Sequence, residues 1–482
     1  MDLSRRQALA AAGSAAFLSA SVFANTTNKN TQTRKWDMSY DVVVAGGGAA
    51  GIMAAIKAAK AGAKVLLLQA AVVLGGNSAI SSGWIRSVNT KWHAKKGIKD
   101  TVEAYRDNIL EYGCGTRNPK KADVIARRSH EFVDFLIDNK VPFTDDEDRF
   151  NGGETLRVVK AQGGGGAIMK GLRHALAKTE GVTVMTSTRL TDIIAATDRD
   201  SLEGVEAENG GKKFYVQTKS LVMATGGFGR NQAYVERFAN QWAKTGRIMD
   251  VCDLGDGLRL ATQLGAGSQN LEICMVCPTL EITRNVFFSS APVVNGAIFV
   301  NEQGRRFTNE YVIYTQTNID MLKQKAVWEI ATPDQHAAVS SMIRMGVATR
   351  CDTVEALAKL IGCPVEGLKA DIDEHNRQTG LPAEKRNDKF GRKAYGKPLK
   401  APYYAARIKP VMIETVGGIT INEKTQVTSL FGTPILKGFY AAGAVAFGEH
   451  FAKGYRSGEA YVYAGVTGLV AGEEAAKYAK NI

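Results

Sequence analysis

Three glycines near the start of the chain have the spacing G-x-G-x-x-G of a phosphate-binding turn. Gly46, Gly48 and Gly51 stand between a valine-rich run at 40–45 and an alanine-rich run at 52–61, an expected strand and helix. The first glycine allows the tight turn, the second lets the backbone approach a pyrophosphate, and the third lets the helix pack on the strand. The helix start adds N–H donors and a positive dipole end. We therefore predict dinucleotide binding by Gly46, Gly48, Ala49, Ala50 and Gly51.

The second expected strand, at 64–68, ends at Gln69. An acidic residue commonly stands at this position and binds the ribose hydroxyls. The amide of Gln69 can also bond a hydroxyl, although more weakly than a carboxylate does. We expect Gln69 to contact the ribose, and a solvated residue at a strand end is the alternative.

Other stretches must position a ligand around this turn. A glycine run at 163–166 opens an expected helix at 167–177, and such a run either cradles phosphate or leaves room for a flat ring. Residues 123–139 have the spacing of an amphipathic helix, 182–185 of a strand and 189–208 of a hairpin. The Lys- and Arg-rich stretch 383–400 is an expected solvated surface loop.

Length and composition indicate a globular protein of two domains, since the chain has 482 residues of which 45% are hydrophobic. The formal charge of +13 is spread along the chain. Because no basic run resembles those of nucleic-acid binders, we expect no nucleic acid as partner. Attraction of anionic substrates or of an acidic redox partner is the better use of this charge.

The six cysteines are scattered, which indicates no disulfide framework. Cys274 and Cys277 form a CxxC, but Pro278 follows where a c-type haem attachment needs histidine. No second CxxC is present, so zinc is not expected. We predict two ordinary buried thiols and no metal.

The first residues resemble a targeting signal. Arg5 and Arg6 precede an apolar run at 8–18 that is too short to span a bilayer, and 22–24 resemble a signal-peptidase site. Paired arginines in this context indicate a twin-arginine signal. We predict a signal peptide at 1–24, a polar linker at 25–38, export to the periplasm and no membrane span.

Three further motifs carry a family resemblance. Gly75-Gly76-Asn77-Ser78, Ala224-Thr225-Gly226-Gly227 and the run 304–310 resemble the flavoprotein family that includes fumarate reductase, urocanate reductase and 3-oxosteroid dehydrogenases. The resemblance implies FAD as cofactor. It also implies an α/β fold with a Rossmann-like FAD domain of the two-dinucleotide-binding type at 39–271 and 413–482, and an inserted α+β capping domain at 272–412.

The same resemblance extends the expected FAD contacts beyond the first glycine turn. The run 163–166 would lie at the edge of the flavin, and the start of the last helix would point at the ring. The additional expected cofactor contacts are Gln69, Gly75, Gly76, Asn77, Ser78, Ser82, Gly83, Gly164, Gly165, Ala224, Thr225, Gly226, Asp256, Gly443, Glu459 and Ala460.

The expected catalytic acid departs from the fumarate reductases. In those enzymes an arginine five residues after the Asn-Glu pair donates a proton, and counting from Asn309-Glu310 gives Tyr314. Tyrosine occupies the matching place in 3-oxosteroid dehydrogenases. A phenol with a pKa near ~10 can donate a proton directly. We predict this role for Tyr314, and a core aromatic residue is the alternative.

Other features of fumarate reductases are replaced. The family's histidine before Pro-Thr is Cys277, and the histidine before Thr-x-Gly-Gly is Glu414. The second carboxylate-binding arginine becomes Val293 or Val294, and the proton-relay glutamate becomes Ser289 or Ser290. Arg456 is the one convincing cationic clamp, with an ion pair to Glu414 or Glu459 as the alternative. The expected substrate contacts are Arg456, Glu414, His450, Phe288, Tyr311 and Trp84.

Because a dicarboxylate needs two cationic clamps, the sequence favours a monocarboxylate. We predict an exported FAD reductase of the C=C bond of a 2-enoate, such as an aryl-acrylate or a urocanate-like compound, in anaerobic respiration. Electrons would come from a separate cytochrome or flavin carrier. One alternative is a 3-oxosteroid-type dehydrogenase with Tyr314 as base, and another is a non-catalytic flavin electron carrier.

Overall fold

The computed structural model describes residues 34–111, 118–145, 157–288, 290–310, 316–393, 395–451 and 455–481. The chain forms two compact units, Met1–Asp37 and Met38–Ile482, and every element below belongs to the second unit. The predicted signal peptide and most of the predicted linker lie outside the described residues. Export and periplasmic location therefore stay predictions.

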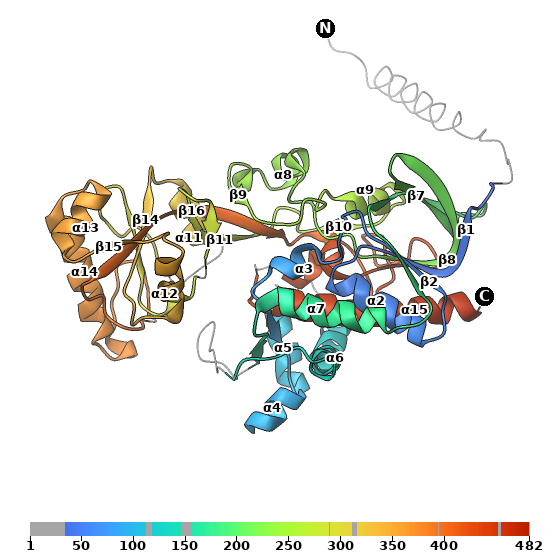
Figure 1. The fold of residues 1–482 in the computed structure, drawn as a ribbon, viewed down its shortest axis with the longest axis horizontal. Coiled ribbons are helices and arrows are strands. Elements are labelled where there is room, and N and C mark those ends of the chain that lie inside the picture. Colours follow the sequence, from blue (N-terminus) through green and yellow to red (C-terminus); the bar gives the residue numbers. More distant parts are fainter. Residues whose placement is uncertain are drawn as a thin grey trace, which may run out of the picture. The chain divides into compact units, whose positions relative to one another are not determined.

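The first sheet has the strand order β5-β2-β1-β8-β7-β6, and β18 pairs with the end of β8 (Figure 1). Strands β5, β2, β1, β8 and β18 are parallel, whereas β6, β7 and β8 are antiparallel. The hairpin predicted at 189–208 is thus confirmed. The strands are β1 Met38–Ala45, β2 Val65–Leu68, β5 Val182–Met185, β6 Thr188–Ala195, β7 Leu202–Asn209, β8 Lys212–Met223 and β18 Phe439–Ala441.

The parallel strands are buried because helices cover the sheet. Val42–Val44 and Val65–Leu67 are fully buried, as expected for short apolar strands covered on both faces. The helices of this part are α2 Ala49–Lys60, α5 Val102–Glu111, α6 Pro119–Asp138, α7 Gly164–Ala177, α9 Asp256–Gln263 and α15 Glu459–Asn481. Helices α2, α7 and α15 lie side by side in Figure 1.

The last helix lies directly on the first one. A Cβ atom at Gly468 would stand 2.3 Å from the carbonyl oxygen of Ala50, and one at Gly472 would stand 2.3 Å from that of Ala54. These two glycines, four residues apart on one face of α15, allow the backbones of α15 and α2 to touch. The C-terminal helix is therefore held against the glycine turn that follows β1.

A second sheet forms the capping domain, with the order β12-β11-β16-β14-β13, and β9 and β15 also pair with β16. Its own apolar clusters lie on the two sides of β14, around Ile298 and Ile330 on one side and Phe299 and Val327 on the other. The elements are β9 Gly246–Arg247, β11 Cys274–Glu281, β12 Val286–Phe287, α10 Ala291–Val294, β13 Ile298–Asn301, α11 Gln316–Leu322, β14 Val327–Ala331, α12 Ala337–Arg344, β15 Thr349–Cys351, α13 Val354–Ile361, α14 Val365–Thr379, η3 Ala383–Lys385 and β16 Tyr403–Thr415.

Short elements connect these parts. They are α3 Gly76–Ile80, β3 Trp84–Arg86, α4 Lys91–Lys96, β4 Val158–Lys160, α8 Gln232–Phe238, η2 Asn240–Trp242, β10 Ser268–Gln269, β17 Gly418–Ile419, η4 Gly443–Ala446 and η5 Gly448–Phe451. Three of them, α3, β3 and η4, contribute residues to a cavity. The domain boundaries stay predictions, and β16 crosses the one placed between residues 412 and 413. Among the described helices, none is long and apolar enough to cross a bilayer.

The prediction of a solvated loop at 383–400 is wrong at its centre. Arg392 is 0% exposed, and Asp388 is also buried. Arg306 donates to Glu310 and to Asp388 at 2.7 Å each, while Arg392 lies 3.2 Å from Glu310. Composition suggested a surface loop because the acidic partner of Arg392 lies 82 residues earlier in the chain. We call Arg306, Glu310, Asp388 and Arg392 the cap ion cluster.

Candidate active site

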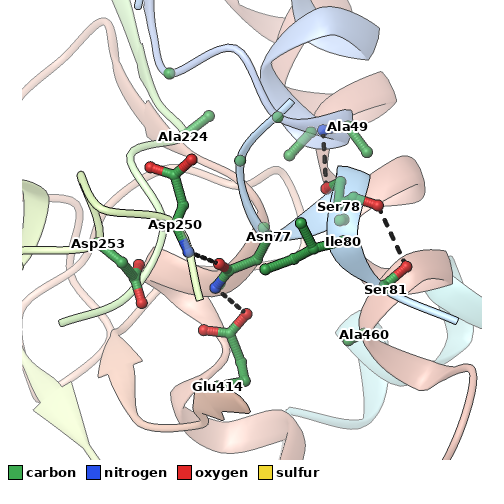
Figure 2. Close-up of a pocket in the computed structure, with 18 of the residues that line it drawn as sticks. Ala49, Asn77, Ser78, Ile80, Ser81, Ala224, Asp250, Asp253, Glu414 and Ala460 are labelled. Atoms are coloured by element: carbon green, nitrogen blue, oxygen red, sulfur yellow. Dashed lines mark hydrogen bonds between the residues drawn. The ribbon is translucent and has the colours of Figure 1, made fainter. Parts of the chain in front are cut away.

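A cavity lies at the carboxyl ends of β1 and β8, where parallel α/β sheets bind their ligands. Its wall includes the turn after β1, helix α3, the segment after β8 and the segment 248–256. The cap contributes residues of β11 and the end of β16. In Figure 2, Asn77 lies between Asp250 and Glu414, and the start of α2 at Ala49 lies beside Ser78.

Most of the residues predicted to contact the cofactor line this cavity. They are Gly46, Gly48, Ala49, Ala50, Gln69, Gly76, Asn77, Ser78, Ser82, Gly83, Ala224, Thr225, Gly226, Asp256, Gly443 and Ala460. Gly51, Gly75, Gly164, Gly165 and Glu459 do not line it, and each has a different structural role.

The glycine turn needs its glycines for close backbone contacts. Gly46 has φ of 114°, and a Cβ atom on it would stand 2.1 Å from the carbonyl oxygen of Ala224. A Cβ atom on Gly51 would stand 1.8 Å from the carbonyl oxygen of Gly46. Gly51 therefore has the packing role expected of the third glycine. Gly75 also supports this turn, because its N–H donates to the carbonyl oxygen of Gly47 at 2.9 Å.

The glycine run at 163–166 makes room for α3, and its place at the edge of the flavin stays a prediction. A Cβ atom on Gly165 would stand 2.0 Å from the carbonyl oxygen of Ser78, and one on Gly164 would stand 3.0 Å from that of Ser81. These glycines thus let α7 pack on the loop that holds Asn77 and Ser78. Sequence spacing could not distinguish a loop from a ligand as the neighbour of the run.

Gln69 is not a solvated strand-end residue, since it is only 6% exposed. Its Oε1 accepts the N–H of Gly47 at 2.7 Å, and its Nε2 donates to the carbonyl oxygen of Val73 at 3.2 Å. The side chain therefore fixes the glycine turn while also lining the cavity. Contact between Gln69 and a ribose stays a prediction.

Glu414, the residue that replaces a family histidine, stands in the cavity wall at the end of β16. Its Oε2 accepts a hydrogen bond from Asn77 Nδ2 at 2.9 Å, and its Oε1 accepts the N–H of Thr415 at 3.2 Å. The Oδ1 atom of Asn77 accepts the N–H of Asp250 at 2.6 Å. Asn77 is thereby fixed between the cap and the segment 248–256.

Asp253 is a second carboxyl group in the same part of the wall and is 3% exposed. Burial raises its pKa, against which hydrogen bonds from the backbone of Gly227 and Gly229 act. Burial also raises the pKa of Glu414 well above the usual carboxyl range, and the negative charge of Asp253 adds to this shift. We call Asp253 and Glu414 the acid pair.

Arg456, the predicted carboxylate clamp, is 3% exposed. Its neighbours Tyr455 and Ser457 line the cavity, but Arg456 itself does not. Its positive charge is close enough to Glu459 to help lower the pKa of that carboxyl group. The predicted alternative, a counter-charge at Glu459, therefore agrees with the structure.

Glu459 and His450 lie together behind the wall instead of in it. His450 Nε2 lies 3.3 Å from Glu459 Oε2, the hydroxyl of Tyr105 donates to the same oxygen at 3.1 Å, and Arg86 lies 4.0 Å from Oε1. Burial opposes ionisation of Glu459, but the hydrogen bond from His450 and the nearby positive charges lower its pKa to about 2. The two residues support the start of α15, and neither is placed to contact a ligand in the cavity.

The aromatic residues predicted for the substrate site differ in position. Trp84 lines the cavity, whereas Phe288 is buried in the cap and its neighbour Phe287 lines the cavity instead. Tyr311 and Tyr314 lie outside the described residues, so their roles stay predictions.

The other residues that replace fumarate reductase features are valines, serines and a cysteine. Val293 is fully buried in an apolar cluster of the cap, and Ser290 lines the cavity with its Oγ 3.1 Å from Thr279 Oγ1. Ser289 lies outside the described residues. Cys274 and Cys277 are buried free thiols on β11, as predicted, and burial raises the pKa of both.

Sequence reasoning missed Asp250 and Asp253. Both line the cavity, and they stand shortly before Asp256, which was predicted to contact the cofactor. Two acidic residues three apart at the entrance to a cofactor segment were a signal that could have been used. The sequence did not show that Glu414, about 160 residues later, is their neighbour.

The wall fits a dinucleotide with a pyrophosphate. Gly48 caps α2 without any side-chain hydrogen bond, and a Cβ atom there would have no neighbour closer than 3.6 Å. The N–H of Ala49 donates to Ser78 Oγ at 3.2 Å, and the absence of a side chain on Gly48 lets an anion approach the positive end of α2. A family model described as an FAD binding domain matches residues 41–460. The chain belongs to this FAD-binding family. FAD is its cofactor, and its flavoprotein fold includes the capping domain.

Named relatives of this FAD-binding protein are reductases. It is 30% identical to a probable fumarate reductase of Shewanella frigidimarina over 91% of this chain and 75% of the relative. It is 26% identical to an acrylate reductase flavoprotein subunit of Shewanella woodyi over 93% and 94% of the two chains. The solved open conformation of a flavocytochrome c3 fumarate reductase is 27% identical with a TM-score of 0.78, over 94% of this chain and 83% of that one. The protein is an FAD-dependent oxidoreductase.

Proposed function

We propose that this flavoprotein reduces the C=C bond of an α,β-unsaturated monocarboxylate, such as an aryl-acrylate or a urocanate-like compound. The observation that carries the proposal is the charge of the wall. Among the described lining residues, Arg189 is the one cation, and it is bound to Asp256. A dicarboxylate would meet Glu414 where the resemblance expects an imidazole group, and the position of the second carboxylate-binding arginine holds the uncharged Val293 or Val294. A substrate with a single carboxylate needs one clamp.

The relatives support reduction of an enoate, and one of them is named for a monocarboxylate. Fumarate, in the name of one relative, is a dicarboxylate, whereas acrylate, in the name of the other, is a monocarboxylate. The acrylate relative is matched over nearly its whole length. Trp84 and Phe287 in the wall favour a substrate with an apolar or aromatic substituent on the alkene.

The proposed roles divide binding from proton transfer. Bound FAD supplies hydride chemistry at its flavin ring. Arg456, adjacent to the wall, holds the substrate carboxylate, and Tyr314 donates a proton to the α carbon. Trp84 and Phe287 keep water from the alkene. A separate cytochrome or flavin carrier would deliver electrons, in a periplasmic anaerobic respiratory chain.

The test is turnover with an artificial electron donor. Holoenzyme is supplied with reduced methyl viologen and with acrylate, cinnamate, urocanate or fumarate in turn. We expect a monocarboxylate to be reduced with a higher kcat/KM than fumarate. The dehydrogenase alternative predicts the opposite behaviour, namely no enoate reduction but oxidation of a 3-oxosteroid with an artificial acceptor.

Tyr314→Phe tests the proposed proton donor. The variant should keep bound FAD and lose at least about 100-fold in kcat, because it removes the general acid. The matched control is Tyr215→Phe on β8, which removes a phenol hydroxyl outside the lining residues and should leave kcat unchanged. Unchanged turnover in Tyr314→Phe would remove the assigned role while leaving the reductase proposal intact.

A further inference from the structure

We propose that Glu414, with Asp253 beside it, is the hydrogen-bond donor that holds the conjugated carboxyl oxygen of the substrate. The inference rests on the proposed function, because it names the group that meets the oxygen where negative charge builds during reduction of an enoate. Glu414 is then a catalytic residue, and Asp253 is a positioning residue that keeps the proton on it.

The hydrogen bonds that the protein makes to the acid pair come from N–H donors to carboxyl oxygens. Both oxygens of Glu414 already accept hydrogen bonds, from Asn77 and from the N–H of Thr415. The Oδ2 atom of Asp253 is buried in the cavity wall and has no hydrogen-bond partner among the described residues. None of these contacts uses a carboxyl proton. A proton on this pair is thus available to an acceptor in the cavity.

No cation compensates the pair. Within the described part of the chain, no Lys, Arg or His forms an ion pair with Asp253 or Glu414. The titratable groups that act on them are Asp250 on the same segment as Asp253, Cys274 on β11 and Tyr455 before α15. All three are neutral or negative. Arg247 acts on Cys274 but is not paired with either carboxylate.

A half-buried Glu414 and a buried Asp253 without a counter-charge cannot both ionise at neutral pH at low cost. Burial is the main cause that raises the pKa of each group. The negative charge of Asp253 raises the pKa of Glu414 further, and that of Asp250 raises the pKa of Asp253. The pair therefore keeps at least one proton at pH values where an exposed carboxyl group has lost it. Asn77 holds Glu414 at the cavity surface.

A neutral carboxylic acid suits this task. Reduction of an enoate places negative charge on the conjugated oxygen, and a fixed donor in a low-dielectric site stabilises that charge. A carboxylic acid kept protonated by an apolar site can serve as such a donor. An ionised Glu414 would repel the same oxygen. Binding of an enoate should therefore weaken once the pair loses its last proton.

The experiment measures the dissociation constant of cinnamate for oxidised, FAD-loaded enzyme by equilibrium dialysis from about pH 6 to about pH 9. The wild-type affinity should be constant at the acidic end and fall by up to about tenfold per pH unit at the alkaline end. Glu414→Gln keeps an oxygen for Asn77 and an N–H for the substrate but cannot ionise. Its affinity should stay within about threefold of wild type at pH 6 and lose most of the alkaline fall.

Asp253→Asn tests the positioning role. Without the neighbouring negative charge, Glu414 ionises more easily, so the alkaline fall should move to lower pH. A residue that only supports the fold would not move this midpoint. Glu329→Gln is the matched control, because burial raises the pKa of Glu329 to about 8 but the residue does not line the cavity. Its binding profile should equal that of wild type.

Two results would overturn the inference in different ways. If cinnamate is reduced in the viologen assay but its binding is independent of pH and unchanged in Glu414→Gln and Asp253→Asn, the acid pair has no such role and the proposed function stands. If no enoate is bound or reduced, the proposed function is wrong and the inference is wrong with it.

Discussion

The cap ion cluster and the acid pair are both groups of ionisable side chains that the fold removes wholly or partly from water, but only the first is balanced. In the cap ion cluster two arginines face two carboxylates, and Arg392 also donates to the carbonyl oxygens of Val293 and Ala297. Burial of Arg306 is offset by Glu310, and the pKa of Glu310 is lowered despite its own burial. In the acid pair two carboxyl groups lie in the same part of the cavity wall, and both pKa values are raised.

The difference separates a structural role from a chemical one. A balanced buried cluster is ionised at any neutral pH and holds segments together, here 306–310 and 388–392. An unbalanced pair costs stability, and a chain that retains it in a ligand cavity gains a proton that can be donated. Glu329 on β14 lies between these cases. Its buried carboxyl group has no hydrogen-bond partner among the described residues, and it does not line the cavity.

The largest expected effect comes from a substitution that removes a carboxylate from the cap ion cluster. Glu310→Gln leaves Arg306 and Arg392 with one carboxylate fewer, so the free energy of unfolding should fall by about 3–5 kcal/mol. Urea unfolding followed by circular dichroism measures it. The exposed pair of Lys369 and Asp373 supplies the control, since Asp373→Asn should cause no measurable change. A loss as small as that of the control would mean that the cluster does not hold the cap.

An intermediate effect comes from Glu329. Its folded pKa of about 8 lies above that of the unfolded chain, so wild-type stability falls as the pH rises from about 5 to about 8. Glu329→Gln removes this dependence, and its stability relative to wild type should rise by about 3.5 kcal/mol over that range. Thermal unfolding at a series of pH values gives the difference. A constant difference would show that Glu329 ionises normally in the folded protein.

The smallest expected effect is an increase in the free energy of unfolding, opposite in sign to the effect of Glu310→Gln. Because folding raises the pKa of Glu414, the ionised unfolded state is favoured above pH ~4.3, and the penalty grows with pH. Glu414→Gln should therefore stabilise the FAD-loaded protein at pH 8, less the hydrogen bond that its amide group can no longer accept from the N–H of Thr415, and the gain should vanish near pH ~4. Urea unfolding at the two pH values measures the gain. Destabilisation at pH 8 would show that Glu414, like the carboxylates of the cap ion cluster, stabilises the folded protein in its ionised form.

The sequence predicted those features that depend on residues close together in the chain. The spacing of Gly46, Gly48 and Gly51 sufficed for the turn, because each glycine answers a backbone contact within one strand–turn–helix unit. The buried state of Arg392 and the meeting of Asp253 with Glu414 depend on partners far away in the chain, which composition and periodicity do not encode. The packing of the glycine run at 163–166 on α3 could not be predicted for the same reason.

The most direct test of the account is reoxidation of the reduced flavin in a single turnover. Purified FAD-loaded protein is reduced without oxygen and mixed with cinnamate, acrylate or fumarate while the flavin absorbance is followed. The account predicts that a monocarboxylate restores the oxidised spectrum faster than fumarate does. A flavin that stays reduced with every enoate, yet is reoxidised by an artificial acceptor, would contradict it.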